Sequence, residues 1–184
     1  RHSNTNKHSF TGDCPMSTLK VDTIQGKTTA GTVAMPSGSV IQVVQGIIKT
    51  QVTNSSSTFA SMHSQAITPK FSSSKIFIMI TGAATADQNN GFYFKIYRGS
   101  TELTDLVGTG GGYENHAQGV TNGSNGDFDM KPFHMQLLDS PSTTSATTYH
   151  LYGAAKGGTA KLGGRADNTD IAIPTSIVLQ EIAQ

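Results

Sequence analysis

The chain has 184 residues, of which 35% are hydrophobic and 14% charged, and its formal net charge is +1. This near-neutral charge gives no electrostatic basis for binding nucleic acid or an acidic membrane. The sequence also contains no run of about 18 apolar residues, which a membrane-spanning helix would need. Cys14 is the single cysteine, so no internal disulfide can form and packing must hold the fold, within one subunit or between several.

Residues 1–39 are expected to form an extended arm or connector. Residues 1–15 are polar and unlike the rest, and Met16 resembles a natural start, so these residues are either an extension or a true arm. Residues 16–39 hold one short strand pattern, at 19–24, and are otherwise rich in Gly, Thr and Ser. Such a segment can bury little surface of its own, so a neighbouring subunit would have to hold it in place.

Strand patterns recur from Val40 to the end of the chain. Residues 75–81 (KIFIMIT) are apolar on both faces, which predicts a central strand covered on both sides. Residues 91–98 (GFYFKIYR) alternate Phe and Ile with Tyr and Lys, which predicts a half-buried strand before a turn at Gly99-Ser100. Gly46 is a candidate bulge or bend, and a short helical piece fits residues 59–65. The predicted strands are 40–52, 75–81, 91–98, 101–107, 127–139, 147–155 and 175–182.

Short strands separated by turn residues predict an all-β sandwich or barrel. Gly and Ser favour turns and Thr favours strands, so this composition disfavours helices. We expect an antiparallel β-sandwich over residues 40–184. Its core is predicted to contain Ile76, Ile78, Ile80, Phe92, Phe94, Ile96, Val178 and Ile182.

Motifs for catalysis or nucleotide binding fail when they are tested. Gly26-Lys27-Thr28 lacks the first glycine of a phosphate-binding loop, since that position is Val21. No G-x-S-x-G nucleophile elbow is present. Glycoside hydrolysis needs two carboxylates in one cleft, whereas the chain has only 12 acidic residues, several of them isolated in turns. We therefore expect a protein that is not an enzyme, with no catalytic residues and no cofactor.

Metal binding has two weak candidates. His134 and His150 lie in predicted strands, where they could form a metal pair, although a histidine bonded to backbone or to a symmetry mate is the simpler interpretation. The segments 127–129 and 167–170 group carboxylates in loops, as calcium sites do, but Asp side chains in turns more often bond their own backbone. We assign no metal ligands.

Residues 109–127 (TGGGYENHAQGVTNGSNGD) form a long, polar, glycine-rich segment. A loop of this length is either functional or a mobile connector, and both interpretations remain open. Tyrosine offers a flat face and the amide, carboxylate and imidazole groups offer hydrogen bonds, which suits contact with a sugar or a protein. The candidate ligand-binding residues are Tyr113, Glu114, Asn115, His116, Asn122 and Asn125.

Five phrases of the sequence carry a resemblance to a known kind of protein. They are MSTLKVDTIQ, PSGSVIQVV, ITPKFSSSKIFIMITG, FYFKIYRGST and TSIVLQEIAQ. With them, residues 16–184 resemble fibre, spike or particle-surface proteins of tailed phages, especially marine ones. The resemblance implies a jelly-roll head related in shape to the tumour-necrosis-factor and C1q heads, which usually form trimers. It carries over no site residue, and residues 1–15 have no counterpart in it.

The resemblance implies a non-enzymatic virion protein, located on the particle surface or tail. In one hypothesis residues 40–184 form a trimeric fibre or spike head that attaches to the host, through a cell-surface glycan or protein. In the alternative the same head decorates the capsid. In both, residues 1–39 bind other virion proteins. The low fraction of hydrophobic residues is consistent with trimer formation, because an oligomer adds buried surface and covers strand edges.

Overall fold

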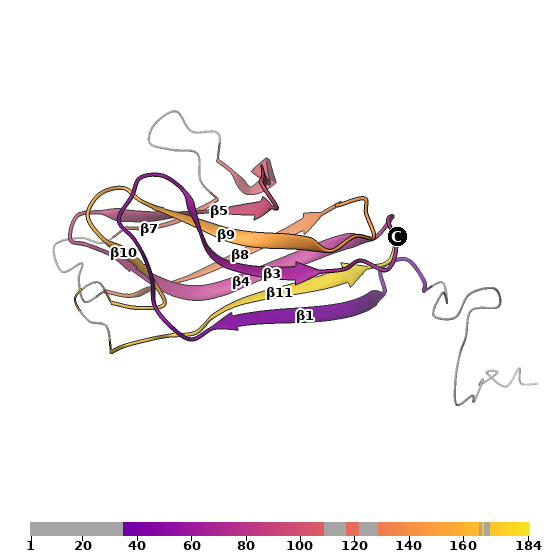
Figure 1. Ribbon diagram of the computed structural model, residues 1–184, viewed down its shortest axis with the longest axis horizontal. Coiled ribbons are helices and arrows are strands. Elements are labelled where there is room, and N and C mark those ends of the chain that lie inside the picture. Colours follow the sequence, from indigo (N-terminus) through magenta and orange to yellow (C-terminus); the bar gives the residue numbers. More distant parts are fainter. Residues whose placement is uncertain (1–34, 109–116, 122–128, 166, 168–169) are drawn as a thin grey trace, which may run out of the picture. The chain divides into compact units, whose positions relative to one another are not determined.

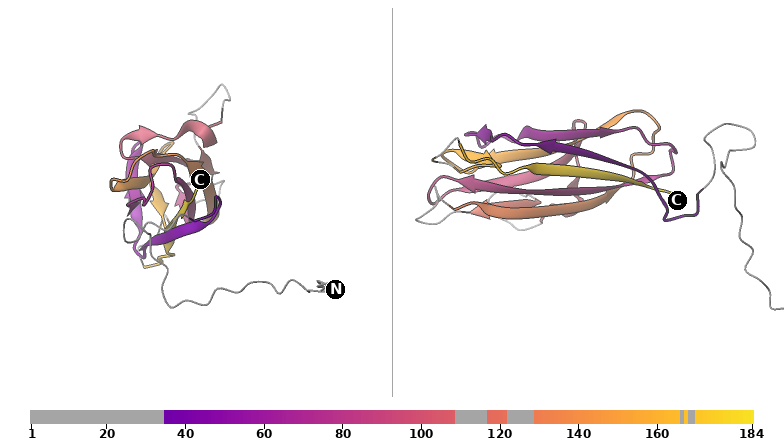
Figure 2. Two further views of the ribbon diagram at one scale, coloured as in Figure 1. Left: turned by 90° about the vertical axis from the view of Figure 1, so that its right-hand side faces the viewer. Right: turned by 90° about the horizontal axis from the view of Figure 1, so that it is seen from below.

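The computed structural model describes residues 35–108, 117–121, 129–165, 167 and 170–184. The chain divides into two compact units, Arg1–Ala34 and Met35–Gln184, and all described residues belong to the second. Two antiparallel sheets lie face to face in this unit (Figures 1 and 2), so the predicted antiparallel sandwich is confirmed. Within the described residues the helical structure is one 3-10 turn, Thr104–Leu106.

The first sheet, called sheet A, has the order β1-β11-β4-β10-β2, and β8 pairs with the other edge of β4. Its strands are β1 (Val40–Ile48), β2 (Val52–Asn54), β4 (Lys75–Ala86), β8 (Lys131–Asp139), β10 (Ala160–Leu162) and β11 (Thr175–Ile182). Because β4 has partners on both edges, the central position predicted for residues 75–81 is confirmed.

The second sheet, called sheet B, has the order β3-β9-β5-β6, and β7 also pairs with β5. Its strands are β3 (Ala60–Ile67), β5 (Gly91–Arg98), β6 (Thr101–Glu102), β7 (Gln118–Thr121) and β9 (Thr147–Ala155). The turn predicted at Gly99-Ser100 joins β5 to β6, and Gly99 has a φ of 56° there.

The strand pairs are nested along the chain. β1 pairs with β11, β3 with β9, β4 with β8 and β5 with β7, all antiparallel. The chain therefore forms one long antiparallel ribbon that is rolled up, so that successive pairs fall alternately in sheet A and sheet B. This is the arrangement of a jelly roll.

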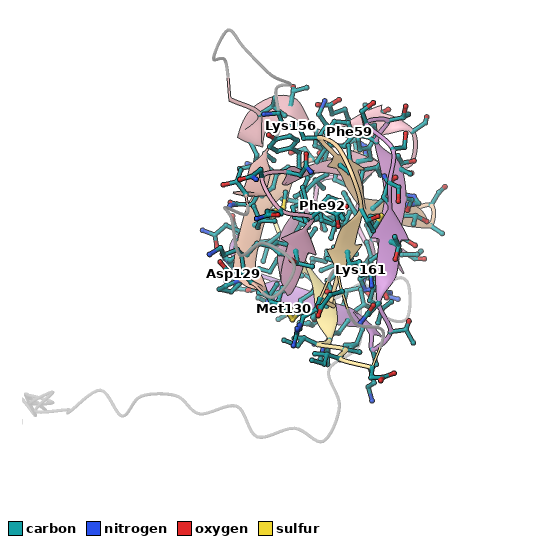
Figure 3. All side chains as sticks on the ribbon, turned by 90° about the vertical axis from the view of Figure 1, so that its left-hand side faces the viewer. Phe59, Phe92, Asp129, Met130, Lys156 and Lys161 are labelled. Atoms are coloured by element: carbon teal, nitrogen blue, oxygen red, sulfur yellow. The ribbon has the colours of Figure 1, made fainter. Side chains whose placement is uncertain are left out.

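The core lies between the two sheets, where Phe92 is fully buried (Figure 3). Six of the eight predicted core residues are confirmed there, namely the isoleucines and phenylalanines of β4 and β5. The prediction for β11 was wrong. Its inward side chains are Ile177, Leu179 and Glu181, whereas Val178 and Ile182 are half-buried on the other side. Both faces of this strand are apolar enough for either register, and the buried Glu181 sits on the face that a carboxylate would be expected to avoid.

Residues 59–65 do not form the short helical piece that their spacing suggested. They belong largely to β3, in which the pairing with β9 shifts between Ser61 and His63. A bulge places two consecutive residues, Met62 and His63, on the buried side. The extra residue interrupts the alternation of buried and exposed side chains. The resulting spacing of buried positions resembles that of a helix.

Gly46 is not a bulge either, because it pairs in register with Ile177 and the irregularity of β1 falls between Val40 and Gln42. A Cβ at Gly46 would lie 2.4 Å from Oε1 of Gln65. The glycine therefore allows β3 to approach β1 closely at the edge of the sandwich.

Several strand limits differ from those predicted. The strand predicted at 101–107 stops at Glu102 and continues as the 3-10 turn, and β2, β7 and β10 were not predicted. These three strands have at most four residues each, which is too short for alternation to be recognised. The start of the predicted strand at 127–139 lies outside the described residues, and β8 covers its remainder from Lys131.

Asp139 joins the two sheets at one end of the sandwich. It lies at the end of β8 in sheet A and accepts hydrogen bonds from two residues of sheet B. Arg98 Nη1 donates to both carboxylate oxygens, at 2.7 and 2.8 Å, and the Tyr149 hydroxyl donates to Oδ2 at 2.7 Å. Burial and this carboxylate raise the pKa of Tyr149 well above its usual range, so the hydroxyl stays protonated and remains a donor.

Asp139→Asn is expected to lower the free energy of unfolding by about 1–3 kcal/mol, because it replaces a charge-assisted acceptor that a buried tyrosine needs. Urea denaturation followed by circular dichroism measures the loss. Asp105→Asn, at an exposed acidic residue, is the matched control and should change stability by less than about 0.5 kcal/mol. Equal stabilities of the two variants would show that Asp139 does not hold the sheets together.

Glu181 is a buried carboxylate that connects β1, β11 and the segment before β4. Gln42 Nε2 donates to it at 2.6 Å, and the amides of Lys70 and Phe71 donate at 2.8 and 3.2 Å. Burial alone would raise the pKa of Glu181, but hydrogen bonds from Gln42 and these amides outweigh it and the net shift is downward. The ionised form is therefore the one that the fold stabilises.

The depressed folded-state pKa predicts acid sensitivity. Above the unfolded-state pKa the ionised carboxylate contributes its full stabilisation, and this contribution is lost as the pH falls toward the folded-state pKa. Glu181→Gln should be about 1–3 kcal/mol less stable than the natural chain at pH 7, and the difference should shrink as the solution is acidified below the usual glutamate range. Thermal unfolding between pH 7 and pH 3 measures it. Parallel pH profiles for the two proteins would contradict this role.

Candidate functional site

The outward side chains of β1, β11, β4 and β8, called face A, combine exposed apolar residues with uncharged polar ones. Val43, Ile47 and Leu138 have exposed fractions of 54, 48 and 46%, which is unusual for large aliphatic side chains grouped on one sheet. The strand registers align the face in three rows across the four strands. The rows are Val43–Gln180–Phe77–Leu138, Gln45–Val178–Met79–Gln136 and Ile47–Ser176–Thr81–His134.

Face A corrects one prediction about β4. The strand was expected to be covered on both sides, but Phe77 and Met79 are only half-buried on its outer side. No carboxylate, ammonium or guanidinium group occurs in the three rows. Their polar members are amide and hydroxyl side chains and one imidazole, and Gln45 Nε2 donates to the Ser176 hydroxyl at 2.9 Å. Such a face can be covered without burying an unpaired charge.

The outward side chains of β3, β9, β5 and β6, called face B, have a different character. Tyr97, His150 and Tyr152, called the tyrosine–histidine cluster, are half-buried neighbours on β5 and β9. The rings of Tyr97 and Tyr152 are stacked, with centroids 4.1 Å apart, and His150 meets Tyr152 edge-on at 5.8 Å. The cluster is therefore a compact aromatic surface of defined geometry.

Polar groups surround the cluster. Tyr97 donates its hydroxyl to Oε2 of Glu102 at 3.1 Å, and Nζ of Lys95 lies 3.1 Å from Oε1 of the same carboxylate. Nζ of Lys95 also lies 4.6 Å from the ring centre of Phe59, which is on the sheet B side of the molecule (Figure 3). Lys95 and Glu102 compensate each other, so this part of face B is nearly neutral.

The titration behaviour of the cluster leaves it neutral near pH 7. Burial lowers the pKa of His150, so its imidazole presents one donor and one acceptor nitrogen. Burial, followed by the hydrogen bond to Glu102, raises the pKa of Tyr97 and keeps its hydroxyl protonated. The cluster can thus donate and accept hydrogen bonds without carrying a charge.

Ser61 and His150 form a pair that resembles part of a catalytic triad. The Ser61 hydroxyl lies 3.0 Å from Nδ1 of His150, a separation that suits transfer of the hydroxyl proton. A triad also needs a carboxylate on the second ring nitrogen. The acidic residue of this region, Glu102, instead bonds Tyr97 and Lys95, so the arrangement favours binding over nucleophilic chemistry.

The candidate residues in the 109–127 segment lie outside the described residues, namely Tyr113, Glu114, Asn115, His116, Asn122 and Asn125. The interpretation of 109–127 as one long loop was wrong in one respect. Residues Gln118–Thr121 form β7, which pairs with β5, and Val120 is buried. A strand this short between glycine-rich stretches gives almost no sequence signal, because its alternation covers four residues.

The two candidate histidines are not brought together. His134 is exposed on face A and His150 lies on face B, so the sandwich separates them and they cannot share a metal ion. Asp129 and Asp167 form ion pairs with Lys131 and Arg165, and the other parts of the two calcium candidates lie partly outside the described residues. Among the residues that the structure describes, no three His, Cys, Asp or Glu side chains are grouped as a metal site would require.

Sequence reasoning missed the tyrosine–histidine cluster, although part of its signal was present. The alternation of residues 91–98 placed Lys95 and Tyr97 on the side away from the core, where the structure also has them. His150 and Tyr152 lie against Tyr97 because β9 pairs with β5. A single sequence does not show which distant strands pair. Within the described residues, no helix is long and apolar enough to cross a membrane.

No family model matches the chain, and no curated protein is significantly similar to it. Solved structures of infectious bursal disease virus show a weak likeness. The Gx strain gives 14% identity and a TM-score of 0.38 over 92% of this chain and 43% of that one, and the Gt strain gives 12% and 0.40 over the same shares. The VP2 subviral particle gives 16% and 0.36 over 79% and 38%. The chain thus spans about two fifths of these viral chains, and TM-scores this low carry no argument about its fold or function.

Proposed function

We propose that this chain is a non-enzymatic virion structural protein, and that its sandwich is the head of a homotrimeric fibre or spike that attaches to a host surface. Face A is the observation that carries the assembly part of the proposal. A sheet face with several large aliphatic side chains about half exposed is unfavourable in water, since each Å² of apolar surface removed from water contributes roughly 25 cal/mol.

A second and third copy of the chain fit face A better than a charged partner does. The three rows contain no carboxylate, ammonium or guanidinium group that would repel its counterpart in a second copy, and their glutamine and serine side chains can pair across the contact. A strongly charged partner would have to give up its hydration and would gain no opposite charge in return. The sequence resemblance to trimeric heads favours three copies around one axis.

The point at which the chain enters the head is consistent with this role. The Gly38 amide donates to the Ala183 carbonyl at 2.8 Å, and the Ala183 amide donates to the Ser39 carbonyl at 2.9 Å. The chain therefore enters the head beside its own end, where β11 finishes (Figure 1). Residues 1–39 would bind other virion proteins, and the 109–127 segment would contact the host.

The assembly is tested by light scattering on the full chain at micromolar concentration, which should give three times the subunit mass of 19.3 kDa. Leu138→Asp places a carboxylate within the proposed contact, at the β8 end of the first row, and should give monomers, because a charge buried without a partner costs several kcal/mol. Ala66→Asp makes a comparable change at an exposed position on face B and should leave the trimer intact. A monomeric natural chain, or trimers for both variants, would rule out face A as the contact.

Attachment is tested by alanine at Tyr113, Glu114 and His116 together. The thermal midpoint should change by no more than about 2 °C, because the segment is expected to contribute little packing, while binding of particles to host cells should fall at least tenfold. Attachment at the natural level would assign the segment a connecting role and favour the capsid-decoration alternative. Loss of folding would show that the segment is structural.

A further inference from the structure

We propose that the tyrosine–histidine cluster of face B is a carbohydrate-binding site, which holds a pyranose ring against the half-exposed rings of Tyr97 and Tyr152. The inference names a ligand class for the proposed attachment role and rests on that role for its biological meaning. The site itself lies within one subunit and on strands, so it requires neither the trimer nor the 109–127 segment.

The two faces of the sandwich differ in the chemistry that they offer. In the described part of the chain, the large hydrophobic strand residues that are clearly exposed are Val40, Val43, Ile47 and Leu138, and all of them belong to sheet A. On face B the outward positions are taken by tyrosine, histidine, serine and threonine, together with Lys95, Glu102 and Ala66. Face B lacks the exposed aliphatic side chains of face A, and its mixture of aromatic and hydrogen-bonding groups is the character that a hydrated ligand needs.

The chemistry of the cluster suits a sugar ring. One side of a pyranose presents C–H bonds and packs on an aromatic face, while its rim presents hydroxyl groups. The stacked tyrosines supply the aromatic surface, and tyrosine loses little conformational entropy when it binds because it has two side-chain torsions. The hydrogen bond from Tyr97 to Glu102 and the contact of Tyr152 with His150 fix both rings before a ligand arrives, which lowers the cost of binding.

Hydrogen-bonding side chains lie around the rings, as a ligand with a hydroxyl-rich rim needs. The register places Ser61 and Lys95 on either side of Tyr152, and Ser64 and Tyr97 on either side of His150. Neutral imidazole and serine hydroxyls both donate and accept, as sugar hydroxyls do. The Lys95–Glu102 pair leaves the region nearly neutral, which favours an uncharged sugar over a phosphate or a nucleic acid backbone.

The experiment uses the full chain and methyl glycosides of glucose, galactose, mannose, rhamnose and N-acetylglucosamine as probes, with saturation-transfer NMR as the readout. At least one probe should receive saturation, and Tyr152→Ala should weaken its binding about tenfold or more. Tyr152→Phe keeps the ring and should restore most of the binding. Thr148→Ala, on the same strand and face but outside the cluster, should bind as the natural chain does. Binding by none of the probes, or unchanged binding by Tyr152→Ala, would overturn the proposal.

A second measurement holds even if a variant fails to fold. Backbone amide shifts of the natural chain, titrated with the bound glycoside, should move on β5 and β9, and shifts confined to residues 109–128 would place the sugar elsewhere and refute the cluster. Monomeric Leu138→Asp should still bind the sugar, since the site lies in one subunit. Sugar binding without trimers would therefore contradict the proposed assembly and support this site. Trimers without sugar binding would support the assembly and contradict this site.

Discussion

The fold depends on the insertion of the last strand between the first strand and the centre of sheet A. β11 pairs with β1 on one edge and with β4 on the other, and β11 is the only partner of β1 among the described strands. The hydrogen bond from Gln42 to Glu181 joins residues 139 positions apart. Such pairings cost much loop-closure entropy before they contribute anything. The rolled ribbon is therefore closed only when the end of the chain is in place, and the buried carboxylate of Glu181 fixes that end to two other segments.

The same strands that close sheet A also give it two apolar sides. β11 and β4 send Ile177, Leu179 and the β4 isoleucines into the core, yet Val178, Phe77 and Met79 remain on the outside. A sandwich of two layers needs one apolar side per sheet, so the second side contributes nothing to the packing of a single subunit. Only 35% of the residues are hydrophobic, and some of them lie on this outer side instead of in the core. Assembly would cover them there.

How much the sequence could predict follows from how local each feature is. The strands β4 and β5 and the turn at Gly99 were predictable, because alternation, apolar runs and turn residues act over a few positions. The phase of β11 was not, since both of its faces are apolar and the decisive contacts of Glu181 come from Gln42, Lys70 and Phe71. The bulge in β3 imitated a helical repeat, and the tyrosine–histidine cluster arises from the pairing of β5 with β9. Each of these depends on distant pairing, which a single sequence does not state.

The two opposite faces of the sandwich differ in chemistry, so they would suit different partners. Face A carries exposed aliphatic side chains among uncharged polar ones and would suit a contact between copies of the same chain, whereas face B is aromatic and hydrogen-bonding and would suit a hydrated ligand. If face A turns toward a three-fold axis, face B of each subunit must turn away from it, because the two faces are opposite sides of one sandwich. A trimer built in this way presents three equivalent clusters outward. Weak binding of single sugars would then add up to firm attachment wherever a surface offers several of them at a matching spacing.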